Sequence, residues 1–127
     1  MANQQQYYIL KQGVAVWNQW RKEHLDILPD LSGVSLIKAN LTCADLSRTD
    51  LSRASLSRID LSESDLSEAN LSGADLNGAF LYRANLGYAD LSEADLSGTF
   101  LDEANLRGAI YAEKQLSQAK SCNNMIR

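Results

Sequence analysis

The chain has 127 residues, a length that predicts a single domain. Sixteen acidic residues against twelve basic ones give a net charge of −4, which argues against direct nucleic-acid binding, because nucleic-acid-binding proteins carry basic surfaces for the phosphates. The start MANQQQYY has no signal-peptide pattern and no run of about 18 apolar residues follows, so we expect a cytoplasmic protein without a membrane partner.

Residues 1–28 carry the spacing of short amphipathic helices. The apolar members recur at intervals of three and four and are Leu10, Val14, Trp17 and Trp20. The polar side of the same stretch holds Asn18, Arg21, Lys22 and Glu23. We expect Gly13 to separate a first helix from a second over about 14–24, and Pro29 to end helical structure. His24 is expected to be solvated or to cap the second helix rather than to act in catalysis.

From residue 31 to residue 106 every fifth residue is leucine, sixteen in succession. Alanine stands two residues before the leucine in ten of these units, Asp or Asn directly before it in twelve, and serine directly after it in nine. The expected structural core consists of Leu31, Leu36, Leu41, Leu46, Leu51, Leu56, Leu61, Leu66, Leu71, Leu76, Leu81, Leu86, Leu91, Leu96, Leu101 and Leu106.

A period of five fits neither of the two common elements. A helix at about 100° per residue would rotate successive leucines by about 140° and spread them around its axis. In a strand, alternation would continue, but the small residue and the leucine are two apart and the next small residue comes three later. Each unit is therefore predicted to be a very short strand followed by a turn, which winds the chain into an all-β solenoid.

The tandem A-(D/N)-L-x-x pattern, as in ANLSGADLNGAFLYRANLGYADLSEADLSG, resembles the pentapeptide repeat family, including cyanobacterial members with an N-terminal helical cap. The resemblance implies a right-handed quadrilateral β-helix over residues 29–110, with four units per coil, about four coils and helical caps. The charges alone leave the choice open, because opposite charges align at a spacing of twenty and also at a spacing of fifteen.

Both flanks are expected to close the ends of the solenoid. Residues 1–28 would form the N-terminal cap through Val14, Trp17 and Trp20, although the two tryptophans could instead line a groove for a partner. After residue 109 the repeat decays, since Tyr111 takes the place of a leucine. We expect residues 111–127 to form a C-terminal cap and tail: a short helix or degenerate coil to about residue 121, then frayed chain over 122–127.

No motif names a reaction, so the chain is predicted not to be an enzyme and to have no catalytic, cofactor-binding or metal-binding residues. Stacked carboxylates such as Asp75 and Asp95 are better explained as turn residues than as an acid pair or cation ligands. Cys43 and Cys122 have no metal-ligand spacing and are expected to be free thiols.

A protein partner is the leading expectation. Phe80, Tyr82 and Phe100 fall at outward positions of one face, with Tyr88 on the next face, and clustered exposed aromatics mark contact surfaces. Packing under the C-terminal segment or stacking between coils would explain the same pattern. We therefore expect a scaffold or protein–protein interaction module that is a monomer or weak homodimer.

The rival function is a DNA mimic. Some pentapeptide repeat proteins resemble duplex DNA in shape and charge and occupy the DNA site of a type II topoisomerase such as gyrase. Residues 29–110 fit this in part, with thirteen acidic and six basic residues. Against it, four coils would match only about six base pairs, and basic residues interrupt the acidic surface early in the repeat.

Overall fold

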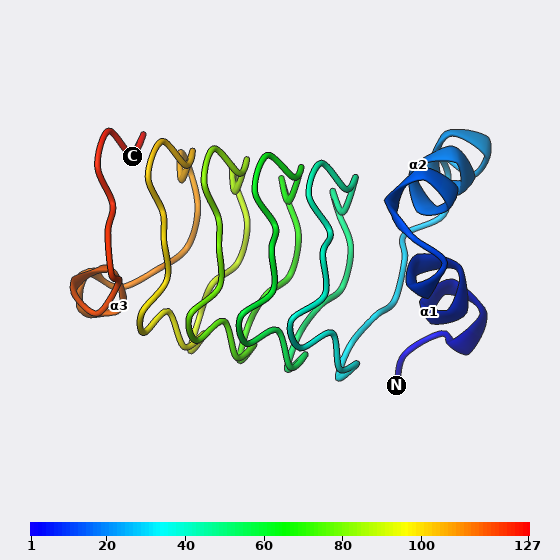
Figure 1. Cartoon of the computed structure of the whole chain (residues 1–127), viewed down its shortest axis with the longest axis horizontal. Coiled ribbons are helices and arrows are strands. Elements are labelled where there is room, and N and C mark those ends of the chain that lie inside the picture. Colours follow the sequence, from blue (N-terminus) through cyan, green and yellow to red (C-terminus); the bar gives the residue numbers. More distant parts are fainter.

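The computed structural model covers residues 1–127 and is an elongated stack of coils with helices at both ends (Figure 1). Helices α1 (Gln4–Lys11) and α2 (Val14–Glu23) lie together at one end, and α3 (Glu113–Ser117) lies at the other. Between them the chain winds as a solenoid of one-residue β-bridges and turns. None of the three helices has the length and apolar composition that a membrane crossing requires.

The register between coils is twenty residues. Parallel bridges join Asp30 to Asp50 and continue in steps of five to the bridge between Asp90 and Ile110. Each unit contributes three backbone hydrogen bonds between coils; in the first pair, Leu31 N–H donates to Asp50 O (2.7 Å), Gly33 N–H to Ser52 O (2.9 Å) and Asp50 N–H to Pro29 O (2.9 Å). Four units therefore complete one turn of the solenoid, which decides between the two spacings that the charges allow.

The leucines of the repeat fill the interior. All sixteen are buried, with exposed fractions of 6% or less, and the small residues two positions earlier pack beside them. Burial of one leucine contributes about 1.5–3 kcal/mol, so this column is the main source of hydrophobic stabilisation. Small side chains at the neighbouring position leave room for the leucines to meet at the axis.

Every unit ends in the same β-turn. Ala44 N–H donates to Leu41 O (3.1 Å), and the equivalent bond recurs along the solenoid. The residue two after each leucine has a positive φ in all sixteen units, as the third residue of a type II turn requires. Glycine occupies only five of these positions, and the other eleven residues hold a left-handed conformation that disfavours a side chain. The uniformity shows that the coil geometry overrides local preference.

Asp and Asn directly before the leucines stabilise these turns. In all twelve units that have one, its side-chain oxygen accepts a hydrogen bond from the backbone N–H two residues further on. Asp50 Oδ1, for example, accepts from both the N–H (3.0 Å) and the hydroxyl (2.7 Å) of Ser52. This local bond explains the preference for Asp and Asn at that position.

Side chains of α2 take the place of a preceding coil on one side of the solenoid. Trp17 is fully buried and its Nε1–H donates to Asp45 O (2.7 Å). Arg21, on the polar side of the helix by sequence, is only 4% exposed, because its guanidinium donates to Asp45 O and to Ser47 O (both 2.9 Å). Burial lowers the pKa of Arg21, against the opposing effect of the Asp45 charge. Asp45 N–H in turn donates to Asn18 Oδ1 (2.8 Å).

The start of the chain closes a second side in the same way. Asn3 N–H donates to Asp30 O and Asp30 N–H to Gln6 Oε1, both at 2.8 Å. Val14 and Trp20 are half-buried against the core, and the ring of Trp20 stacks on His24, the residue that caps α2.

At the other end, the expectation of a frayed tail over 122–127 is wrong. Leu116 of α3 is buried over the last coil, and the chain then pairs again, with bridges from Phe100 to Ser121 and from Asn105 to Ile126. These bridges span twenty-one residues, so one extra residue shifts the register. Asn124 has the positive φ of a repeat turn (57°), which shows that a further unit is formed with Cys122 in the leucine position.

Strain at the turns predicts an unusual effect of glycine. Glu93 forms no ion pair and has a φ of 63°, so Glu93→Gly is expected to raise the free energy of unfolding by about 0.5–1 kcal/mol. Ser92→Gly is the control, because the preceding position does not have a positive φ; it is expected to lower stability by at least as much, since it also removes the Ser92 hydroxyl that hydrogen-bonds Asp90. Urea denaturation compares them. Equal destabilisation by both would contradict the turn assignment.

Candidate interaction surface

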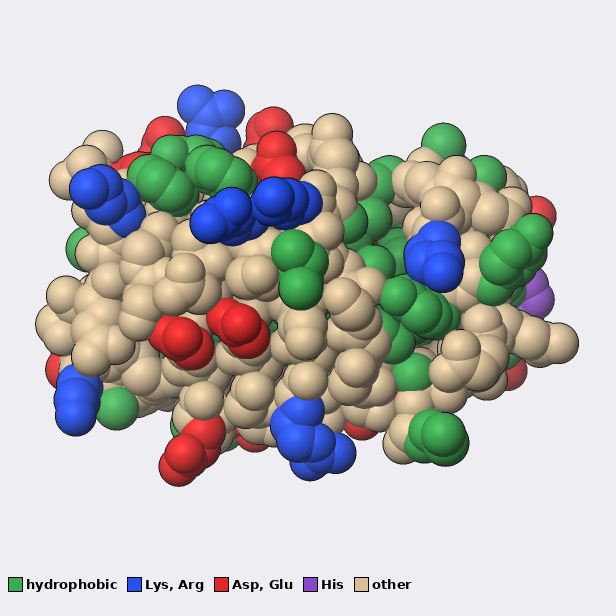
Figure 2. Space-filling model, turned by 60° about the horizontal axis from the view of Figure 1, so that its bottom comes forward, with side chains coloured by type: hydrophobic (Ala, Val, Ile, Leu, Met, Phe, Trp, Pro, Cys, Tyr) green, Lys and Arg blue, Asp and Glu red, His purple; other side chains and the backbone are tan.

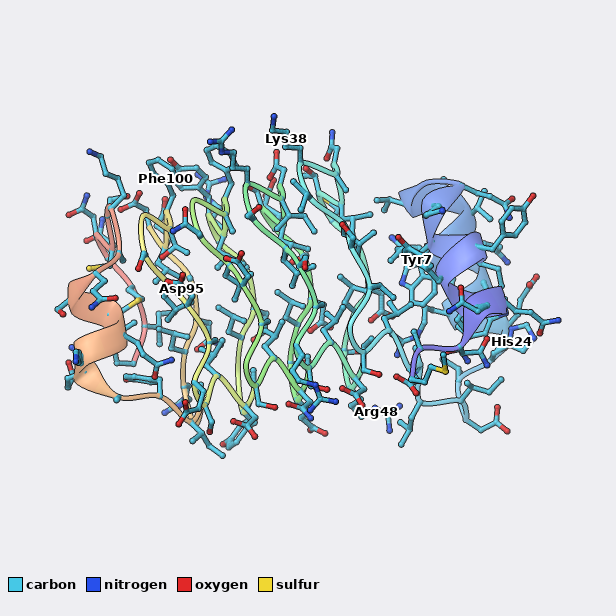
Figure 3. All side chains as sticks on the ribbon, turned by 90° about the horizontal axis from the view of Figure 1, so that it is seen from below. Tyr7, His24, Lys38, Arg48, Asp95 and Phe100 are labelled. Atoms are coloured by element: carbon cyan, nitrogen blue, oxygen red, sulfur yellow. The ribbon has the colours of Figure 1, made fainter.

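Three aromatic side chains from adjacent coils form one cluster on the outside of the solenoid. Phe80 and Phe100 stack nearly parallel, with ring centroids 5.0 Å apart and an interplanar angle of 6°. Tyr82 lies 6.3 Å from Phe80 and 5.6 Å from Phe100. Figure 3 shows Phe100 along the same side of the solenoid as Lys38. We call Phe80, Tyr82 and Phe100 the aromatic cluster.

The aromatic cluster interrupts a column that is otherwise polar. Bridges place Phe80 and Phe100 in line with Asp60 on one side and Ser121 on the other. Asp60 accepts a hydrogen bond from the backbone N–H of its own turn, and a phenylalanine side chain has no oxygen to do so. The units of Phe80 and Phe100 therefore lack this turn hydrogen bond and have ring stacking instead. Both rings are half-buried and Tyr82 is 36% exposed, so the C-terminal segment, which pairs at Ser121, leaves the cluster partly open.

A charged column borders the aromatic cluster. Arg83 follows Tyr82 and lies between Glu63 and Glu103 of the adjoining coils, with N–O distances of 3.9 and 3.5 Å. The arginine side chain is 62% exposed and each glutamate 54% exposed, so these ion pairs add little to stability. An apolar centre with a charged rim is the usual composition of a protein–protein interface.

Tyr88 lies apart from the aromatic cluster. Its ring covers Gly108 of the next coil so closely that an added Cβ there would be 2.4 Å from the ring. The side chain is 68% exposed and stacks on no other aromatic ring. The structure thus brings together three of the four aromatic residues that the sequence singles out, and places the fourth as a separate exposed side chain.

A carboxylate beside the aromatic cluster holds the C-terminal segment. Asp102, in line with Tyr82, accepts hydrogen bonds from the Ser121 hydroxyl and from Asn123 N–H, both at 2.7 Å. These two donors lower the pKa of Asp102. We call these two hydrogen bonds the clamp at Asp102. The repeat pattern does not predict the clamp, because the C-terminal register is shifted by one residue. The only sequence signal for it is the turn-forming pair at residues 123–124.

Several other polar groups take part in local contacts within the fold. The carboxylate of Asp30 accepts from the N–H and the hydroxyl of Ser32, which together lower the pKa of Asp30. The His24 ring lies 2.9 Å from Trp20 O. Cys43 and Cys122 are exposed free thiols, and the structure contains no group of three metal-binding side chains.

The repeat is recognised by comparison with known families. A model described as pentapeptide repeats, in eight copies, matches residues 30–67 and 64–102, more than half of the chain. The chain belongs to the pentapeptide repeat family. The resemblance seen in the A-(D/N)-L-x-x pattern is thereby confirmed. No protein of curated function matches this pentapeptide repeat protein significantly.

Solved structures of the family include cyanobacterial neighbours. HetL, involved in heterocyst differentiation regulation in Nostoc sp. strain PCC 7120, is 49% identical over 63% of this chain (TM-score 0.43), and the match spans only 36% of HetL. Rfr23 from Cyanothece 51142 is 27% identical, covering 86% of this chain and 96% of its own (TM-score 0.32).

QnrB1, a plasmid-mediated fluoroquinolone resistance protein, is 18% identical and covers 76% of this chain and 57% of its own (TM-score 0.55). Its likeness supports the solenoid fold of this pentapeptide repeat protein.

The clamp at Asp102 predicts a pH dependence. Because the folded-state pKa is lowered, the clamp stabilises the folded chain above the unfolded pKa of about 4 and is lost as the pH falls through the lower folded value. Amide exchange at Ser121 and Asn123 should therefore accelerate below about pH 4, relative to intrinsic exchange. In Asp102→Asn, which keeps one acceptor oxygen without the charge, this acceleration should be smaller. An identical pH profile in both proteins would contradict the clamp.

Proposed function

We propose that this pentapeptide repeat protein is a non-enzymatic scaffold that binds a protein partner through the aromatic cluster. The observation that carries the proposal is the pair Phe80 and Phe100, which occupy positions where twelve other units have a turn-capping Asp or Asn. Stacked rings that remain partly exposed give a rigid apolar centre, and rigid aromatic side chains lose little conformational entropy on binding.

We further infer the architecture that presents this surface. Residues 1–28 are the N-terminal cap, 29–110 the β-helix, right-handed and of about four coils, and 111–127 the C-terminal cap. The twenty-residue pairing and the helices at both ends support this division. With both ends partly covered, the protein works as a monomer or weak homodimer, and we expect it in the cytoplasm.

The outer charges favour a protein partner over DNA mimicry. Carboxylates do stack along the solenoid, for example Asp75 on Asp95. However, Arg53 and Arg58 lie exposed along the first coils, with their side chains over Gly73 and Gly78. A mimic of duplex DNA needs a continuous negative surface, and these cations interrupt it.

A pull-down from the source cells tests the proposed surface. The double substitution Phe80→Ser with Phe100→Ser should lose at least one specifically recovered protein, because it removes the apolar centre of the contact. Tyr88→Ser is the matched control, since it removes an exposed ring outside the cluster. Thermal melts must show that all three baits are folded. Recovery of the same proteins by every bait would refute the proposal.

A supercoiling assay addresses the rival function. We expect no inhibition of gyrase at micromolar concentrations of the protein. Inhibition that survives the double phenylalanine substitution would favour a DNA mimic instead.

A further inference from the structure

The N-terminal edge of the first coil is only partly closed. In each unit of the solenoid, three backbone groups point toward the preceding coil: the N–H and C=O of the residue before the leucine, and the C=O of the residue after it. In the unit containing Asp45, all three are paired with side chains of α2. In the unit containing Asn40, all three are free: Asn40 N–H, Asn40 C=O and Thr42 C=O.

The neighbouring unit is also partly free. Tyr7 donates its hydroxyl to Ser35 O (2.6 Å), while Ser35 N–H and Ile37 C=O have no partner. We call residues 35–42 the open edge. It is a strand edge with unsatisfied donors and acceptors, the feature that binds extended peptides by adding a strand. Figure 3 shows Tyr7 between the helices and the first coil.

A groove runs along the open edge. Its volume is about 490 Å³, and it is lined on the helical side by Leu10, Lys11 and Gly13 and on the coil side by residues 35–37 and 39–41. Ile37 is 51% exposed beside it. Figure 2 shows hydrophobic side chains gathered where the helices meet the solenoid. The groove therefore offers apolar contact next to free backbone groups.

The charge at the groove is positive. Lys11 lines it, with Nζ 4.6 Å from the centre of the Tyr7 ring. Lys38, in the turn between the two coil segments, lines a separate hollow on the outside of the solenoid with Asp75 and Asp95. Neither lysine forms an ion pair within the chain. The unpaired ammonium group of Lys11 favours an acidic ligand at the groove.

We propose that the open edge binds an extended acidic segment of a partner protein. The segment adds a short parallel strand that pairs with Asn40 N–H and C=O, places an apolar side chain against Ile37, and brings a carboxylate to Lys11. The segment thereby gives the backbone groups of the Asn40 unit the hydrogen-bond partners that side chains of α2 give to the Asp45 unit. The surface is separate from the aromatic cluster, so the inference stands independently of the proposed function.

A second copy of the chain fits the open edge less well. The strand edge that another copy would offer is the C-terminal unit, which carries the unpaired Lys120, while Arg127 is paired with Glu113. Lys120 has the same sign as Lys11, so a second copy brings no charge complementary to the groove. An acidic peptide has the complementary sign.

A titration of the full-length ¹⁵N-labelled protein tests the inference. The probe is the blocked heptapeptide SEADLSG, the sequence of residues 92–98, which has two carboxylates and one leucine. We expect saturable shifts of the Ser35 and Asn40 amides with a Kd of about 1 mM. At a peptide concentration of nine times Kd, exchange of the Asn40 amide should slow about tenfold. The Asp45 amide, already paired, should not respond.

Two variants and one control sharpen the result. Ile37→Glu and Lys11→Glu should each weaken binding at least tenfold, because both add negative charge to the groove. Tyr88→Glu, also exposed but distant from the groove, should bind as the unaltered protein does. Absence of saturable shifts at millimolar peptide would overturn the proposal. So would shifts confined to the aromatic cluster, or shifts of residues 35–42 on raising the protein concentration alone, which would identify a second copy as the occupant.

Discussion

Backbone hydrogen bonding between coils is the constraint on which the rest of the structure depends. A strand of one residue cannot be stable alone, so each unit must pair with the units twenty residues before and after it. This requirement holds the turns in one conformation, even where eleven of them place a side chain at positive φ. It also turns the leucines to a common axis, where their burial stabilises the stack.

The same constraint determines what happens at the ends. A coil without a neighbour exposes donors and acceptors, and the chain satisfies some of them with groups from the terminal segments. Arg21 and Asn18 do this at one end, while Gln115 of α3 donates to Leu91 O and Ala94 O at the other. At residues 35–42 most of the backbone groups that face the missing coil have no partner, and a groove lies beside them. Side chains on the outside of the solenoid take no part in the backbone pairing between coils, so these positions can carry the aromatic cluster.

Much of the fold could be predicted from the sequence, because its period reports the interior directly. The leucine spacing excludes a helix and indicates a solenoid, and the spacing around Trp17 indicates helices before it. The charge pattern could not choose between three and four units per coil, since long side chains reach neighbours in either register. The C-terminal unit was missed because one inserted residue moves Cys122 into a leucine position. The role of Arg21 was hidden because its partners are carbonyls, which every sequence has.

The most direct test of this account is detection of scalar couplings across the hydrogen bonds between coils in the isotope-labelled protein. The account predicts a coupling from the amide nitrogen of Leu51 to the carbonyl carbon of Asn70, whose atoms form a 2.8 Å hydrogen bond, and from Asn70 to Thr49. Couplings from Leu51 to a carbonyl near residue 65, or to residue 47 as in a helix, would contradict it.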